Sequence, residues 1–156
     1  MKPGSDLTGG GVRYLLDRLV ADIARGRFER SLSGITAISA LITGGEVYFE
    51  HDRASFGKPV MWFPVVLTSL MIAAGAGGVL SKKFAKTALP AVSAVSFVTG
   101  FAGTYFHIRG IAQRPGGWGA KFVKYNVEMG PPLFAALLFS MVGGMGIVSA
   151  ILQRED

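Results

Sequence analysis

Four long stretches of this chain are almost free of charged residues, and they constrain the fold more than any other feature. They cover roughly residues 33–50, 60–80, 89–107 and 131–152. A helix of about 20 apolar residues crosses the hydrocarbon core of a bilayer, which is roughly 30 Å thick. Only 17% of the residues are charged, whereas a soluble domain carries about a quarter. The sequence therefore predicts an all-α integral membrane protein with a four-transmembrane-helix bundle.

The composition excludes several kinds of site and partner. The chain has no cysteine, which rules out disulfides, iron–sulfur clusters and thiolate metal sites. Its formal charge of +6 does not indicate a nucleic-acid partner, because Lys and Arg gather in the loops of membrane proteins. Residues 1–32 contain no short apolar core followed by a small-residue cleavage site, so we expect no cleavable signal peptide.

Residues 1–32 are predicted to form a cytoplasmic N-terminal segment that contains an amphipathic helix. Apolar residues recur there at the spacing of one helix face, namely Val12, Leu15, Leu16, Leu19, Val20 and Ile23. Such a helix either lies on the membrane surface, with its arginines among anionic headgroups, or packs against a partner subunit. Periodicity alone does not separate these two positions. Residues 33–156 then form the transmembrane domain.

The distribution of Lys and Arg predicts the orientation of the bundle. These residues are more numerous in the N-terminal segment, the loop around residues 82–86 and the C-terminus than in the loops at the other end. Because Lys and Arg favour the cytoplasmic side of a membrane, we expect both termini to be cytoplasmic. The predicted location is the cell inner membrane, as a multi-pass protein.

The two halves of the transmembrane domain resemble each other. The segment Tyr-Phe-Glu at 48–50 corresponds to Tyr-Phe-His at 105–107, and a Met-x-x-Pro motif occurs at both 61–64 and 129–132. Glycine pairs follow the two prolines at equal offsets, as Gly75 and Gly78 and as Gly143 and Gly146. This pattern predicts two tandem helical hairpins inserted in the same sense. The glycines would let the helix backbones approach closely.

Ionisable residues gather where the predicted helices end on the non-cytoplasmic side. One face of the first helix carries a polar stripe, formed by Ser39, Thr43, Glu46 and Glu50. A carboxylate in a spanning helix costs a few kcal/mol unless it is paired, and it tends to face the bundle interior. We therefore predict a metal site for Fe, Cu or Mn, with the ligands Glu46, Glu50, His107 and Glu128. The Glu-x-x-His spacing of di-metal bundles is absent.

The same cluster is compatible with three further hypotheses. His51 and His107 end equivalent helices and would serve as the two axial ligands of a haem b. Met61 and Met129 would add soft ligands for copper, although methionine in an apolar helix usually serves packing. In the third hypothesis, the carboxylates only form ion pairs with the arginines and lysines of the same end.

The segment between the third and fourth helices, residues 109–128, contains a Pro-Gly-Gly sequence that predicts a tight turn. Trp118 follows this turn, and Lys121, Phe122, Lys124 and Tyr125 come next. These residues would either dock a periplasmic partner, close over a lipid or quinone headgroup, or form an interfacial aromatic belt with lysines reaching to the headgroups.

For function, the sequence favours a membrane subunit of a redox or electron-transfer complex, with a metal, haem or quinone site near the non-cytoplasmic face. One alternative is an accessory or structural subunit without a cofactor. Another is a small transporter or proton pathway through Glu46, which the repeat suggests. Whether the protein is an enzyme stays undecided. Expected partners are membrane lipid and either other membrane or periplasmic subunits or further copies of this chain.

Overall fold

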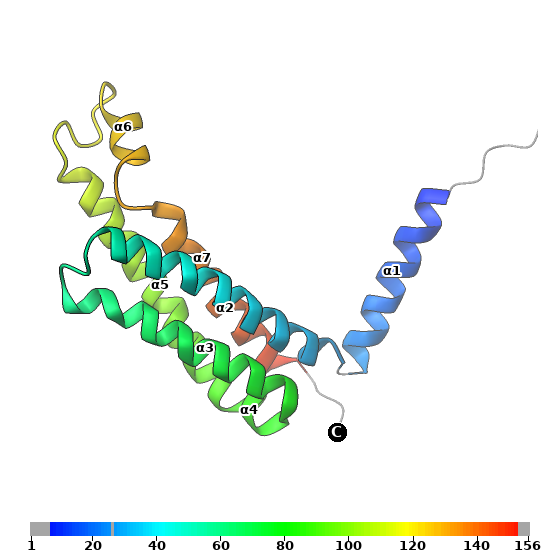
Figure 1. The fold of residues 1–156 in the computed structure, drawn as a ribbon. Coiled ribbons are helices and arrows are strands. Elements are labelled where there is room, and N and C mark those ends of the chain that lie inside the picture. Colours follow the sequence, from blue (N-terminus) through cyan, green and yellow to red (C-terminus); the bar gives the residue numbers. More distant parts are fainter. Residues whose placement is uncertain (1–6, 26, 153–156) are drawn as a thin grey trace, which may run out of the picture.

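Figure 1 shows the fold in a computed structural model that describes residues 7–25 and 27–152. All regular structure in these residues is helical. The elements are α1 (Leu7–Ala24), α2 (Arg27–Arg53), the 3₁₀ helix η1 (Pro59–Met61), α3 (Trp62–Leu80), α4 (Lys82–Lys86), α5 (Ala88–Ala112), α6 (Val123–Glu128) and α7 (Leu133–Ile151). The predicted cytoplasmic ends fall partly outside this description, since residues 1–6 and 153–156 are not included.

Four helical segments are long and apolar enough to cross a membrane: Arg27–Arg53, Pro59–Leu80, Lys82–Ala112 and Leu133–Ile151. The prediction of an all-α protein with four such helices is confirmed. The second and fourth lie close to their predicted ranges. The first begins at Arg27 and the third ends at Ala112, so both extend into charged sequence. A helix needs apolar residues only where it crosses lipid, and its backbone hydrogen bonds continue through polar residues beyond that point.

The four long helices form a ring in which each contacts two neighbours. Helix α2 packs on α3, α3 on α5, α5 on α7, and α7 on α2. Helices α2 and α5 therefore occupy opposite corners of the bundle. Helix α1 makes few contacts and extends away from one end of the bundle (Figure 1), with the apolar side chains of Val12, Leu15, Leu16, Leu19 and Val20 exposed.

Small residues bring the helices together, most closely between α5 and α7. A Cβ atom built on Gly143 would lie 2.6 Å from the backbone nitrogen of Phe97, and one on Gly100 would lie 2.5 Å from that of Ser140. Both distances are shorter than real Cβ contacts, so these positions accept only glycine without a backbone shift. Close backbone approach is the usual means of helix association in membranes, and here it fixes the register of α7 against α5.

The end of the bundle near α4 holds a buried polar cluster. The hydroxyls of Ser33 and Ser149 lie 2.8 Å apart, and Ser149 donates a hydrogen bond of 3.1 Å to the backbone carbonyl of the fully buried Glu29. Lys86 donates to the carbonyls of Ala150, at 2.8 Å, and Leu152. These carbonyls end α7 and have no partner within the helix, so Lys86 caps α7 and ties it to α4.

Candidate functional site

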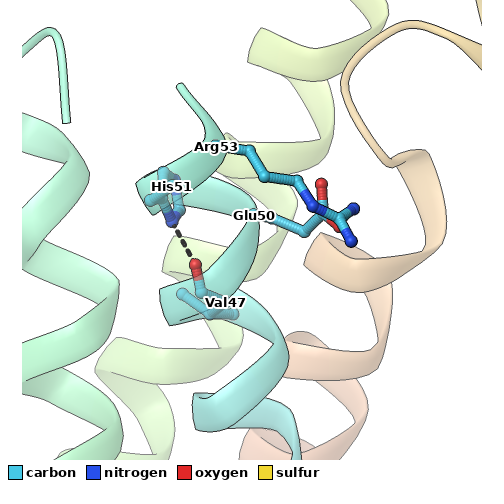
Figure 2. A network of polar contacts seen from close by, with 4 residues as sticks. All are labelled: Val47, Glu50, His51 and Arg53. Carbon is cyan, nitrogen blue, oxygen red and sulfur yellow. Dashed lines mark hydrogen bonds and ion pairs between the residues drawn. The ribbon is translucent and has the colours of Figure 1, made fainter. Parts of the chain in front are cut away.

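The candidate site lies at the opposite end of the bundle, called here the loop end, where residues 54–58 join α2 to α3 and residues 113–132 join α5 to α7. Two of the predicted residues, Glu50 and His51, lie at the end of α2 (Figure 2). The carboxylate of Glu50 pairs with Arg53 at 2.5 Å. The Nδ1 atom of His51 lies 2.7 Å from the carbonyl oxygen of Val47, on the other side of α2 from Glu50 (Figure 2). The imidazole ring also stacks on Phe56 at a centroid distance of 6.2 Å.

Glu46 was expected to face the bundle interior, but its side chain is exposed on α2. The face of α2 that is buried consists of Glu29, Ser33, Thr36, Ala40 and Val47. Most of these side chains are small, so this face allows the closest approach to α3 and α7. Helical geometry turns Glu46 about 100° away from Val47, which places it outside the contact.

His107 and Glu128 belong to the other half of the loop end. The Nδ1 atom of His107 lies 2.8 Å from the carbonyl oxygen of Pro132, so this imidazole joins α5 to the start of α7. Glu128 is exposed and lies 3.9 Å from the ammonium group of Lys124, one turn earlier in α6. The predicted ligands thus make separate local contacts, with Glu50 on Arg53, His107 on Pro132 and Glu128 on Lys124.

Within residues 7–25 and 27–152, no three His, Asp or Glu side chains form a group that could hold a metal ion. Helices α2 and α5, which carry Glu46 and His107, sit at opposite corners of the ring. The prediction of a shared metal or haem site therefore receives no support from side-chain positions within one chain, and it stays a prediction.

The two histidines nevertheless share one chemical feature. In each, Nδ1 faces a backbone carbonyl oxygen, which only accepts hydrogen bonds. Nδ1 must then carry the proton, and in the neutral imidazole Nε2 keeps its lone pair. This is the tautomer in which a histidine binds a metal through Nε2.

The most organised part of the loop end is the segment 113–132, which three polar side chains hold together. Asn126 is 2% exposed, and its amide nitrogen donates to the carbonyls of Pro115, at 3.0 Å, and Gly117, at 2.8 Å. Arg114 donates to the carbonyl of Met129 at 2.7 Å. Together with His107, these contacts close the loop on both sides of α6.

The sequence showed a tight turn here but not the residues that stabilise it. Gly116 and Gly117 have φ angles of +78° and +46°, in the left-handed region that glycine adopts without strain. A Cβ atom on Gly116 would also overlap the ring of Phe122. An asparagine shortly after a Pro-Gly-Gly turn is the only sequence signal for the amide brace, and it does not reveal which carbonyls the amide reaches.

Helix α6 carries the buried Asn126, and three large apolar side chains in or beside the helix are exposed. Tyr125 lies within α6 and is 59% exposed, and the flanking residues Phe122 and Met129 are 43% and 61% exposed. We call these three residues the α6 face. Lys121 and Lys124 border it, and the ammonium group of Lys121 lies 5.6 Å from the ring centroid of Phe122.

A belt of exposed aromatic residues occurs lower on the bundle, formed by Tyr48, Phe49, Trp62, Phe63, Tyr105 and Phe106. Such belts mark the boundary between lipid and water. Helix α5 continues from Tyr105 to Ala112, which adds roughly 10 Å at the helical rise per residue. The loop with α6 begins only there, and Figure 1 shows it beyond the turn that joins α2 and α3.

No protein-family model, curated protein or solved structure matches this chain.

Proposed function

We propose that this chain is a multi-pass membrane subunit of a larger complex, and that its α6 face docks a partner protein on the non-cytoplasmic side. The observation that carries the proposal is a group of exposed large apolar side chains in and beside a braced helix, beyond the aromatic belt. Lipid tails do not cover a surface at that height. Large apolar side chains exposed to water are characteristic of interaction sites, and aromatic residues are enriched at the centres of protein interfaces.

The brace around α6 also supports docking. A loop that is already ordered loses little conformational entropy when a partner binds, so more of the contact energy contributes to affinity. Lys121 and Lys124 border the α6 face with positive charge, against the single carboxylate of Glu128. We therefore expect the partner surface to have an apolar centre surrounded by acidic residues, whose negative charge complements the lysines beside the α6 face.

The first prediction concerns the partner complex. A photoreactive amino acid at position 122 is expected to form an adduct with one protein in native membranes, and mass spectrometry of the adduct identifies this partner. Tyr125→Ala should then weaken binding of the purified pair roughly 30-fold, because truncating an aromatic anchor costs about 2 kcal/mol. Gln113→Ala, at an exposed position outside the α6 face, should leave Kd unchanged. Adducts with lipid alone, or equal affinity of the Tyr125→Ala protein, would refute docking through the α6 face.

A second candidate function is electron transfer through a haem b or a non-haem metal, and the shared tautomer of the two histidines favours it. Both imidazoles lie at the loop end with Nε2 able to act as a ligand. Because His51 and His107 lie on opposite corners of the ring, a centre that uses both would include groups from a partner subunit or a second copy. A quinone site near the same histidines belongs to this candidate as well.

The absorption spectrum and metal content of the protein purified from its native membrane test this second candidate. Haem ligation predicts a Soret band that His107→Ala removes. A non-haem site predicts stoichiometric Fe, Cu or Mn that Glu46→Ala removes without a change in helix content. If the folded protein showed neither a Soret band nor stoichiometric metal, the remaining function would be that of an accessory subunit without a cofactor. A proton pathway through Glu46 would need a second subunit, because this side chain lies outside the ring.

The finer architecture belongs to the same proposal. We infer that the α2–α3 and α5–α7 pairs are two copies of one hairpin, since α2 contacts α3 and α5 contacts α7 more extensively than any other helix. We also place α1 on the cytoplasmic membrane surface. Its exposed apolar residues suit an interfacial helix, and the excess of Lys and Arg at this end favours the cytoplasmic side of the inner membrane.

A further inference from the structure

Glu46 lies within a stripe of exposed apolar residues on α2. Ile38, Ile42 and Phe49 are 62%, 69% and 61% exposed, and Glu46 is exposed among them. With Ile35, the spacings along the stripe are three, four, four and three residues, so the stripe runs straight along one side of the helix. Gly45 lies beside Glu46, and a Cβ atom built on it would meet nothing within 4 Å. The stripe is therefore an open surface with a single carboxylate.

The contact between α2 and α3 shows how deep this carboxylate lies. A Cβ atom on Gly44 would touch the Thr68 side chain, so these two residues are level in the bundle. Thr68 is six residues after Trp62, which corresponds to about 9 Å of helix. Glu46 is two residues, or about 3 Å, nearer the loop end than Gly44. It therefore lies about 6 Å below the level of Trp62. When α2 crosses a bilayer, Glu46 is thus among the lipid tails.

A carboxylate at this depth is unfavourable unless it is paired, and the described part of this chain supplies no cation there. Helices α3 and α7 contain no charged residue. Arg53 is nearer the loop end and already pairs with Glu50, and Arg109 lies above the belt residue Tyr105. A second copy of the chain has the same residues, so it cannot supply a cation at this depth either.

We infer that the exposed stripe of α2 packs against a transmembrane helix of a partner protein, and that this helix carries a Lys or Arg level with Glu46. The inference rests on the proposed role as a subunit of a larger complex, but it uses a surface separate from the α6 face. Gly45 lets the partner helix approach closely, the isoleucines supply the packing surface, and the Glu46 carboxylate selects a helix with a buried cation. A pair between Glu46 and this Lys or Arg explains why a carboxylate lies on an otherwise apolar face of α2.

The inference is tested with a synthetic probe, because the selectivity of Glu46 does not depend on the identity of the partner. A Leu- and Ala-rich transmembrane peptide carries a single Lys about 6 Å below its outer end, and a matched peptide has Leu instead. Both are incorporated with the purified protein into phosphatidylcholine vesicles, and association is measured by energy transfer. The Lys peptide is expected to bind wild-type protein at least ten times more tightly than the Leu peptide. Glu46→Gln should remove this preference, whereas Asp52→Asn, at an exposed carboxylate near the end of α2, should keep it.

The two proposals fail in different ways in native membranes. A photoreactive residue at position 42 is expected to form an adduct with a membrane protein, and Glu46→Gln should reduce that adduct without affecting the adduct at position 122. A protein adduct at position 42 without one at position 122 would count against the α6 face and leave the inference about Glu46 standing. Equal binding of the Lys peptide to wild type and Glu46→Gln would overturn the inference. Position 42 could also form adducts between two copies of this chain. If these adducts persisted in Glu46→Gln, the inference would be overturned as well. A thermal unfolding curve of Glu46→Gln like that of wild type establishes that the variant is folded.

Discussion

Replacing Gly143 with alanine is expected to lower the free energy of unfolding by about 3 kcal/mol, at the upper end of the usual cost of overpacking. The new methyl group would lie 2.6 Å from the backbone nitrogen of Phe97 and 2.7 Å from the carbonyl oxygen of Ser93. Both are backbone atoms of α5, so no side-chain rotation relieves the clash. Helices α5 and α7 would have to move apart along their whole contact. Unfolding in detergent, followed by circular dichroism, measures the effect.

The neighbouring glycine offers a matched control for this experiment. A Cβ atom on Gly144 would lie 3.7 Å from the ring of Phe97, an ordinary van der Waals distance. Since alanine also has a higher helix propensity than glycine, Gly144→Ala should be neutral or stabilising by up to about 1 kcal/mol. If the two variants lost the same stability, the close approach of α5 and α7 would not be what holds these helices together.

Replacing Asn126 with alanine is expected to release the segment 113–132 while leaving the four long helices folded. The change removes the only side-chain donor to the carbonyls of Pro115 and Gly117 that the described residues show. Each of these two hydrogen bonds contributes about 1 kcal/mol, and losing both is enough to open a loop. Hydrogen exchange should then rise in residues 113–132, with protection in α3 and α7 unchanged.

Tyr125→Ala serves as the comparison, because Tyr125 is exposed and its side chain takes no part in the brace. It should leave hydrogen exchange of the loop as in wild type but weaken partner binding. Asn126→Ala should weaken partner binding through disorder, although Asn126 is buried and cannot touch the partner. Faster exchange throughout the bundle in Asn126→Ala would contradict a local role for this residue.

The helices could be predicted from the sequence because lipid imposes a simple condition on them. Residues 60–80 and 131–152 contain no charge, and a segment of that length crosses a bilayer only as a helix. A tight turn at Pro115 also followed from the sequence, whereas α5 continues to Ala112, past His107, where the sequence predicted its end. Each of these predictions depends on neighbours along the chain, which the sequence displays directly.

The face that each helix buries could not be predicted in the same way. In a soluble protein the apolar side of a helix turns inward, but in a membrane helix almost every side is apolar, so hydrophobicity does not select one. The polar stripe of Ser39, Thr43, Glu46 and Glu50 suggested the inner face. Close packing selected instead the small residues around Ser33 and Ala40, and Glu46 was left outside.

The amino-acid sequence is enough to indicate helices able to cross a membrane, to exclude thiolate chemistry, and to locate a cluster of ionisable residues near the ends of the predicted helices. Which of these residues meet follows from the folded structure. Asn126 reaches two carbonyls of a turn, His107 reaches Pro132, and Lys86 reaches the end of α7. The contacts of His107 and Lys86 join residues 25 and 64 positions apart, so they depend on how closely the helices pack, which the sequence does not display.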